Sequence, residues 1–564
     1  LFDPDSVKRE MNAVDSEHKK NINNDWWRIY RMFDLISKKD SPINKFGTGN
    51  LETLNKKGLR DRMIKFYNDF YCSENISLAI ISSINLEKLN KIIKKYFGEI
   101  KHKKPNNFII NQPFYHKNNK SYHIQSVSKM KTMIFLWEIP TFHNDIEYKS
   151  WNIITDFIND NGLESLESFL KSKGLIEDLF IFPRNHGILM LAVDLLKNNK
   201  KYRQDVSNYI NYYIKTLLDQ NWEKISKYFQ KNGELIYHNN PRMNPLGLIQ
   251  NLANNCHYLD MEDVRSWSLI KKIDGNRIKN LLKKYINNNY IEILVSDKKE
   301  NIKYKKEKYY GIKYGFLEPL SKDEKKLKYN FNLDNPYHCI SPTNMKISKK
   351  METPKKENNI WYGATSQFNE PKIYCILQFS SYNYFNSVKK YLINNITIKS
   401  IEYYFSRKFN QENKLGYYCD FKLNLLEGAL YLYITGNNDK YNLFFKNSIN
   451  YIQNIELDNY VIKSIIKETK DNISNSDKIP SWEYSNILVD EYCIKYDYTK
   501  DQLSQGLKEI KINDIKTHTK NILNGHLVPF FYGNFKKKDL PNMDIFEKNM
   551  NKKIHKLYKI KKIK

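Results

Sequence analysis

The spacing of apolar and polar residues predicts a helix at the start of the chain. Asp3 followed by Pro4 is typical of a helix beginning, because aspartate can accept a hydrogen bond from a free backbone N–H and proline has none to leave unpaired. Glu10, Val14 and Glu17 then recur at intervals of four and three residues, as neighbours on one helix face do. Two carboxylates on one face suit a shared cation or proton, and the same spacing also occurs on plain solvent-exposed faces.

A pattern in which a helix ending in Asn leads into a short apolar strand occurs three times. The strands are predicted at residues 76–81, 291–295 and 527–531, and further helical patterns follow at 86–97 and 540–550. The copies lie far apart, whereas solenoid repeats recur about every 20–50 residues. The pattern therefore predicts three related α+β domains.

The same pattern divides the chain into four segments. Residues 1–105 are interpreted as the C-terminal part of a first domain, and residues 106–300 as a second domain. Residues 301–344 are rich in Lys, contain Pro and are weakly periodic, which indicates an interdomain linker. Residues 345–564 form a third domain that opens with a predicted strand at 372–379.

The chain is basic, with 92 Lys and Arg against 63 Asp and Glu and a formal net charge of +29. Such a charge attracts nucleic acid non-specifically, so a basic nucleic-acid-binding protein is one hypothesis. The lysines are spread along the whole chain, however, and no RNA-recognition signature or zinc-finger spacing is present. We therefore expect no specific nucleic-acid partner; salt-dependent binding with a sequence preference would contradict this expectation.

The six cysteines form no Cys-x-x-Cys pair, which argues against a disulfide framework or a thiolate zinc site. Their pattern mildly favours a reducing compartment, so we expect a cytoplasmic location. No apolar run approaches the roughly 18 residues that a membrane-spanning helix needs, and no membrane partner is expected.

Three motifs near the start of the chain resemble a known family. The run at residues 9–21, the Asn-Asp-Trp-Trp-Arg at 24–28 and the Phe-Gly-Thr-Gly-Asn loop within 45–54 are similar to the insulin-degrading enzyme branch of the pitrilysin family of zinc peptidases. The resemblance implies that Glu17 is the distal zinc ligand and that Glu10 helps to orient the metal site. The cofactor that it implies is zinc (Zn).

The family's other two zinc ligands and its general base come from a His-x-x-Glu-His helix upstream of the distal Glu. None of the 12 histidines here begins that motif. We therefore expect the chain to be a piece of a larger protein, inactive alone, whose catalytic motif precedes Leu1. The alternative is a non-catalytic relative that has lost the motif and serves as a subunit or partner protein, although the presence of both Glu10 and Glu17 argues against it.

The resemblance also implies a fold and an activity. The fold is a set of repeated αβ-roll domains of the pitrilysin/insulysin type, each an antiparallel sheet packed with helices. The activity is that of a zinc metalloendopeptidase that cleaves peptides or small proteins inside a closed chamber. A homodimer is compatible with this resemblance.

One further region has a counterpart in the family. The strand at 178–182 falls where the family holds substrate N-termini by strand addition, and Leu179 matches a substrate-binding position there. Two of the family's glycines fall on Asn159 and Ile181, however. An ordinary interior strand is the alternative interpretation.

Overall fold

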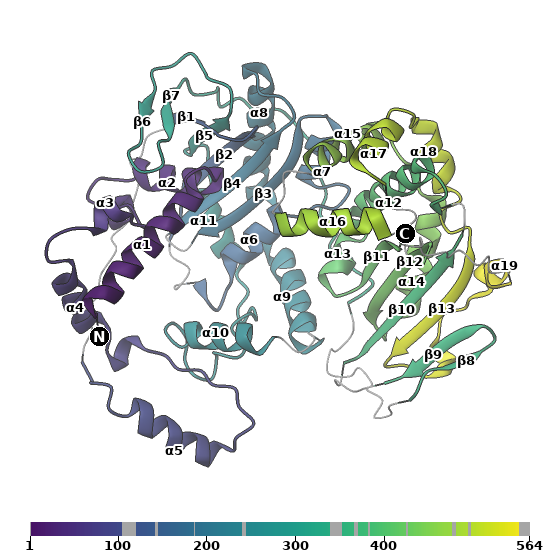
Figure 1. Ribbon diagram of the computed structural model, residues 1–564, viewed down its shortest axis with the longest axis horizontal. Helices are drawn as coiled ribbons and strands as arrows, with labels where there is room; N and C mark the ends of the chain where they lie inside the picture. Colours follow the sequence, from purple (N-terminus) through teal and green to yellow (C-terminus); the bar gives the residue numbers. More distant parts are fainter. Residues whose placement is uncertain are drawn as a thin grey trace. The chain divides into compact units, whose positions relative to one another are not determined.

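The computed structural model of the chain (Figure 1) describes residues 2–103, 120–140, 145–184, 187–239, 244–338, 352–365, 370–381, 384–424, 427–476, 481–493 and 498–551. The chain folds into two compact units. Unit 1 comprises Leu1–Gln230 and Met243–Leu333, and unit 2 comprises Lys231–Arg242 and Asp334–Lys564.

Unit 1 is built on a seven-stranded mixed sheet, here called sheet A, with the strand order β3-β4-β2-β5-β1-β7-β6. Strands β1 and β5 are parallel, and the other neighbours are antiparallel. The strands are β1 (Ser121–Gln125), β2 (Lys131–Glu138), β3 (Ile176–Arg184), β4 (Ile188–Leu195), β5 (Ile291–Ser296), β6 (Lys305–Lys306) and β7 (Lys313–Leu317).

The helices of unit 1 precede the sheet or connect its strands. They are α1 (Pro4–Asn21), α2 (Asp25–Ile36), α3 (Leu51–Leu54), α4 (Leu59–Phe70), α5 (Leu86–Phe97), α6 (Ser150–Ile158), α7 (Leu166–Ser172), α8 (Lys200–Thr216), α9 (Trp222–Asn239), α10 (Pro245–Asn255) and α11 (Gly275–Tyr285). The part of α9 from Lys231 onward is assigned to unit 2. Gly174, with φ of +64°, ends the segment after α7 in the left-handed conformation that glycine adopts freely.

Sheet A is buried on both faces. On β2, Phe135 and Trp137 pack with α6, α7, α8, α9 and α11, whereas Ile134 and Leu136 face the opposite side and pack with Ile29, Met32 and Phe33 of α2. Successive side chains of a strand point to opposite faces, so a strand covered on both sides reads as a continuous apolar run. This explains why β2 is apolar throughout its centre.

Unit 2 repeats this topology in a six-stranded sheet, here called sheet B, with the order β11-β12-β10-β13-β9-β8. Strand β9 is parallel to β13, as β1 is to β5. The strands are β8 (Lys355–Glu357), β9 (Ile360–Ala364), β10 (Lys372–Ser380), β11 (Tyr418–Asn424), β12 (Ala429–Asn437) and β13 (His526–Gly533). The helices are α12 (Val388–Lys408), α13 (Asn410–Lys414), α14 (Tyr441–Asn454), α15 (Asn459–Asn475), α16 (Ser481–Cys493), α17 (Lys500–Leu507), α18 (Ile512–Thr519) and α19 (Glu547–Met550).

The predicted repeat is therefore present in two sheets. The apolar strands predicted at 291–295 and 527–531 are β5 and β13, and each lies between the same kinds of neighbours in its own sheet. The predicted class of repeated α+β domains is confirmed.

The predicted strand at 76–81 differs: these residues form no strand. Ile76, Leu78 and Ile81 are 41%, 44% and 50% exposed, so the described residues cover these side chains only in part. A strand requires a partner for its backbone hydrogen bonds, and apolar alternation alone cannot supply one. The helix predicted at 540–550 is also shorter than expected, because only Glu547–Met550 is α-helical there.

The predicted domain limits near residues 105 and 344 lie outside the described residues, and the four-part division stays a prediction. Within the segment predicted as a linker, β7 pairs with β1 and thereby extends sheet A. The break between the two units falls at residues 333 and 334, inside the same segment.

Candidate functional site

Helix α1 carries the two candidate metal-site carboxylates on its solvent side. Its first turn forms as predicted, since the Asp3 carboxylate accepts a hydrogen bond from the Ser6 backbone N–H at 3.0 Å and Pro4 occupies the first helical turn. Glu10 and Glu17 are both exposed. The prediction that they share a face agrees with this placement, and their chemical roles stay predictions.

The opposite side of α1 is fixed to the rest of unit 1. Asp15 is buried and accepts a hydrogen bond from the Leu51 backbone N–H at 3.0 Å, which lowers the pKa of this carboxyl, as does its bond with Lys19. The His18 ring lies 3.1 Å from the Tyr309 carbonyl oxygen through Nε2 and contacts the rings of Phe46 and Tyr310. His18 is therefore a packing residue, although it follows Glu17 directly in the sequence.

The described residues do not by themselves complete a zinc site. Zinc in peptidases takes three protein ligands, and the described part of the chain brings together no group of three His, Cys, Asp or Glu side chains that could hold a metal ion. Glu17 and Glu10 offer carboxylate oxygens, which suit zinc as ligands. Any further ligands must come from outside the described residues.

A buried ion pair that spacing did not reveal holds the helix next to α1. Arg31 of α2 donates from Nε to Glu307 Oε1 at 3.0 Å, and both side chains are almost fully buried. The other oxygen of Glu307 accepts from the backbone N–H groups of Tyr309 and Tyr310 at 2.9 and 2.7 Å. Nothing in the local pattern around Arg31 identifies a partner so distant in sequence.

Two further contacts position the N-terminal helices. Asp25 accepts hydrogen bonds at 2.8 Å from the backbone N–H groups of Val127 and Ser128, in the loop between β1 and β2. Arg28 donates to the Tyr310 carbonyl oxygen at 2.7 Å. Asp25 and Arg28 thus anchor α2, the helix that follows α1, to sheet A and its loops.

The glycine-containing loop before α3 is a packing element. Phe46 stacks on Tyr309 with ring centroids 4.0 Å apart, and Thr48 bonds the Tyr310 hydroxyl at 3.1 Å. Gly49 has φ of +85°, and a Cβ there would lie 3.5 Å from Val14 of α1. The loop therefore packs against the helix that carries Glu10 and Glu17.

Strand β3, which contains Leu179, lies at the edge of sheet A. Among the strands that the structure describes, β3 is thus an edge strand and not the interior strand of the alternative interpretation. The Leu179 side chain is buried, with 6% of its surface exposed, so its contribution at this edge is through its backbone. Asn159, which follows α6, reaches Ile181 of β3 with its side-chain amide.

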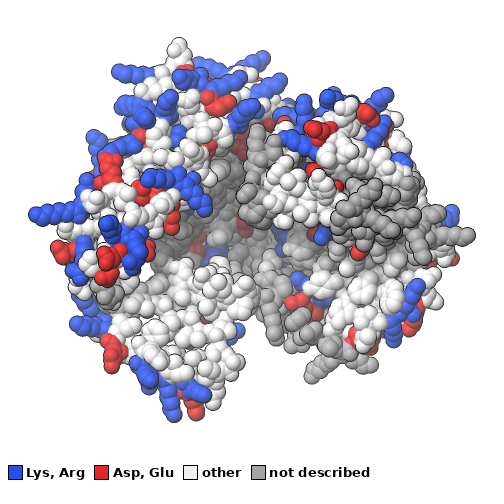
Figure 2. Space-filling model, in the orientation of Figure 1, with Lys and Arg blue, Asp and Glu red and all other residues white. Residues whose placement is uncertain are grey.

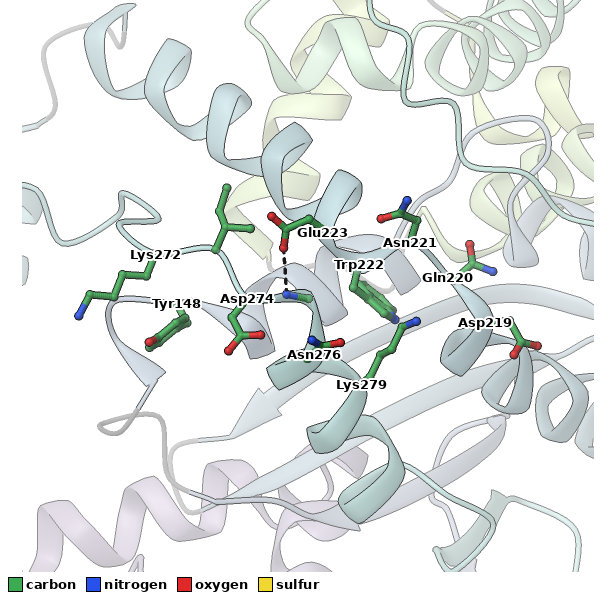
Figure 3. Close-up of a pocket in the computed structure, with 12 residues that line it drawn as sticks. Tyr148, Asp219, Gln220, Asn221, Trp222, Glu223, Lys272, Asp274, Asn276 and Lys279 are labelled. Carbon is green, nitrogen blue, oxygen red and sulfur yellow. Dashed lines mark hydrogen bonds between the residues drawn. The ribbon is translucent and has the colours of Figure 1, made fainter.

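A pocket of about 860 Å³ lies between the first turns of α9 and α11 (Figure 3). Its polar groups already have structural roles: Asp274 accepts from the Arg277 backbone N–H at 2.9 Å, and Glu223 accepts from that of Gly275 at 3.3 Å. Gly275 is required there, because a Cβ would lie 2.6 Å from the backbone nitrogen of Glu223. The pocket shares no residue with α1 and contains no arrangement typical of a catalytic site.

Glu292 of β5 is a buried carboxyl for which spacing gave no signal. It is 2% exposed, and neither side-chain oxygen has a hydrogen-bond partner among the described residues. Burial raises its pKa to about 7, while the positive charges of Lys322 and Arg203 partly oppose this shift. Because the folded-state pKa lies above the ordinary value of 4.5, folding is favoured below that value and loses this contribution as the pH rises through about 7.

Glu292→Gln is therefore expected to raise the free energy of unfolding at pH 8 and to leave it nearly unchanged at pH 5. The gain at pH 8 is up to about 2 kcal/mol, because the variant has no buried charge while Lys322 loses an attractive partner. Calorimetric unfolding of the two proteins at both pH values measures it. An equal difference at the two pH values would show that the carboxyl does not titrate in this range.

Comparison with known proteins places this architecture. Residues 59–227 match the family model described as the peptidase M16 inactive domain, and residues 237–506 match the one described as the middle or third domain of peptidase M16. The chain belongs to the M16 peptidase family.

Among similar M16 proteins, the insulin-degrading enzyme of Bos taurus is 24% identical over 582 residues, which cover 95% of this chain and 55% of that protein. The A-factor-processing enzyme of Saccharomyces cerevisiae is 25% identical over 411 residues, which cover 67% of this chain and 40% of that protein.

A solved structure supports the same fold. The crystal structure of pitrilysin superposes with a TM-score of 0.67 and 17% sequence identity, covering 96% of this chain and 60% of that one. The predicted resemblance to the insulysin branch of the M16 family is thus confirmed. The chain spans about half the length of the insulin-degrading enzyme that it matches.

Proposed function

We propose that this chain is part of a zinc metalloendopeptidase in which Glu17 is a zinc ligand and Glu10 orients the site. The observation that carries the proposal is the placement of α1. Asp15 and His18 fix its inner side, while Glu10 and Glu17 stay exposed on its outer side. A carboxylate on a firmly held helix can meet ligands from another segment without further ordering of its own backbone.

Zinc supplies a defined chemistry when it is bound, since it polarises a carbonyl and lowers the pKa of a water molecule. The contribution of this chain is to present the Glu17 oxygens at a fixed place. Glu10 lies about two helical turns before Glu17 on the same face of α1. At that distance it acts on the orientation of the metal site rather than on the substrate.

The surface of residues 59–97 indicates that more polypeptide packs beside α1. Phe66 of α4 and Leu86 and Tyr96 of α5 are 55%, 82% and 68% exposed, and neither helix contains a buried residue. An uncovered apolar surface of this kind marks a place where another segment binds. We infer that the polypeptide segment that binds this apolar surface completes the first domain and supplies the remaining zinc ligands.

The test of this proposal is metal removal from the longest form of the protein. Peptide cleavage is expected to stop when a chelator removes the metal and to return when zinc is added back. The readout is the fluorescence of a quenched peptide substrate. A protein that contains all of its domains and cleaves no peptide with zinc present would instead support the alternative of a non-catalytic subunit.

The remaining features are part of the same proposal. The substrates are peptides or small proteins, the compartment is the cytoplasm, and a homodimer is to be tested by light scattering. No helix among the described residues is long and apolar enough to cross a membrane. On the face shown in Figure 2, Lys and Arg are spread among other residues rather than gathered in one patch, which does not favour a specific nucleic-acid interface.

A further inference from the structure

Among the residues that the structure describes, β3 is the first strand of sheet A and pairs only with β4, so its other edge has no neighbouring strand. A free edge normally presents unpaired backbone N–H and C=O groups, to which an extended peptide can add as a further strand. Residues two positions apart direct these groups to the same edge. The outward groups of β3 are those of residues 179, 181 and 183, since the Ile181 groups meet Asn159 outside the sheet.

The side-chain amide of Asn159 imitates a neighbouring strand at Ile181. Its Nδ2 donates to the Ile181 carbonyl oxygen at 2.7 Å, and its Oδ1 accepts from the Ile181 backbone N–H at 2.8 Å. One amide group thus pairs both backbone groups of this residue. An arriving peptide strand would have to make the same two hydrogen bonds.

The other outward positions of β3 also lack a free N–H. The Leu179 backbone N–H donates to the Asp178 side chain at 3.0 Å, and Pro183 has no N–H. At these three alternate positions, β3 therefore has no free backbone N–H group to donate to an added strand. Such protection is a known way in which proteins prevent edge pairing.

The position of Asn159 at the end of α6 explains how its side chain can also move away from the β3 edge. It caps the end of α6, where its own backbone N–H bonds the Thr155 carbonyl oxygen at 2.8 Å. The helix therefore fixes its backbone, while its side chain is solvent-exposed. The amide can leave the edge by rotation alone, without unpacking the core.

Unit 2 uses a similar device at the corresponding position. Strand β11 is the edge strand of sheet B, and the Phe421 backbone N–H bonds the carboxyl of Glu402 in α12. Burial and the nearby Asp420 charge raise the pKa of Glu402, the Phe421 hydrogen bond lowers it, and the net result is a pKa of about 7. In both units a side chain from the preceding helical segment covers the edge backbone.

We propose that Asn159 is a plug on the β3 edge, so that an extended peptide can add to this strand only by displacing the Asn159 amide. The residue then determines which peptides bind, since a ligand must offer backbone pairing strong enough to compete with it. This inference rests on the proposed function only in taking a peptide as the ligand.

Two measurements on the full chain test the plug. The first is hydrogen–deuterium exchange over Ile176–Arg184, where Asn159→Gly and Asn159→Ala should both accelerate exchange of the Ile181 amide at least about tenfold. Asn159→Asp should have a smaller effect, because it keeps an acceptor for the N–H and loses the donor to the carbonyl. Asn152→Ala, which changes another exposed Asn of α6 two helical turns before Asn159, is the matched control and should change nothing.

The second measurement is fluorescence anisotropy with a labelled peptide of alternating Val and Thr that has the nine-residue length of β3. Asn159→Gly and Asn159→Ala should bind it about tenfold more tightly than the unchanged chain, and a backbone N-methylated peptide should show no gain. Equal affinities of the unchanged and Asn159-substituted chains, or equal Ile181 exchange, would overturn the proposal. Neither readout uses zinc or cleavage, so a failure of the proposed peptidase function remains distinguishable.

Discussion

Replacing Glu17 by Gln in the longest form of the protein is expected to remove most of its bound zinc and nearly all peptide cleavage. Glutamine keeps the size of the side chain and its place on α1 but loses the anionic oxygen that binds the metal. Changing a residue that only supports a metal ligand commonly costs 10–100-fold in affinity, so the loss of a ligand itself should exceed about 100-fold. Zinc content by plasma mass spectrometry and cleavage of a quenched peptide measure the two effects.

The neighbouring carboxylates provide the comparison for this experiment. Glu10→Gln should weaken zinc binding by about 10–100-fold, which is less than the effect of Glu17→Gln, because Glu10 is proposed to orient the site. Asp5→Asn alters another exposed carboxylate of α1 and should leave zinc content unchanged. Full zinc content and full activity in the Glu17→Gln protein would rule out the assignment of this residue.

Local chemistry made the beginning of α1 predictable. The Asp3 cap and Pro4 act within one helical turn, so the four residues that decide the start of the helix are adjacent in sequence. The spacing of Glu10 and Glu17 likewise depends only on helical periodicity. The partners of this helix face cannot be predicted from spacing, because a metal site depends on residues that other segments bring to it.

The repeat was predictable for a related reason. Strands β5 and β13 are each short and apolar, and Asn residues lie between each strand and the helix before it, so this punctuation is visible in any one copy. The stretch at 76–81 has the same signal but no strand beside it among the described residues. The sequence pattern therefore predicts the tendency of a segment to form a strand, and pairing with a neighbouring strand decides whether the strand forms.

The contacts that sequence did not reveal join distant residues. Asn159 appeared only as a departure from a family glycine, and its pairing with Ile181 requires the C-terminal end of α6 to lie beside the sheet edge. Nothing in the sequence marks Arg31 and Glu307 as partners, yet the two side chains are buried together as an ion pair. No spacing rule links residues so far apart; only the tertiary fold brings them together.

The ion pair between Arg31 and Glu307 is the second feature with a large expected effect. Arg31→Ala should lower the free energy of unfolding of unit 1 by about 3–5 kcal/mol, because it leaves the Glu307 carboxylate buried without its cation. The same guanidinium also donates from Nη1 to the carbonyl oxygens of Asn44 and Lys45 at 3.1 and 3.3 Å. Its loss should therefore loosen the loop that packs against α1 as well as α2.

Calorimetry and hydrogen exchange together separate these consequences. The unfolding transition of unit 1 should move to lower temperature, and amide exchange in α1 and α2 should increase more than exchange in β2. The matched control is Lys65→Ala, which breaks an exposed i,i+4 pair with Asp69 on α4 and should cost less than about 1 kcal/mol. Similar small losses in both variants would show that the apolar residues of α2 and the contacts of Asp25 and Arg28 hold this helix without help from the ion pair. A large loss confined to Arg31→Ala would instead show that the ion pair is a main contact between α2 and the loop from β6 to β7, and that α1, which precedes α2, depends on it for its position.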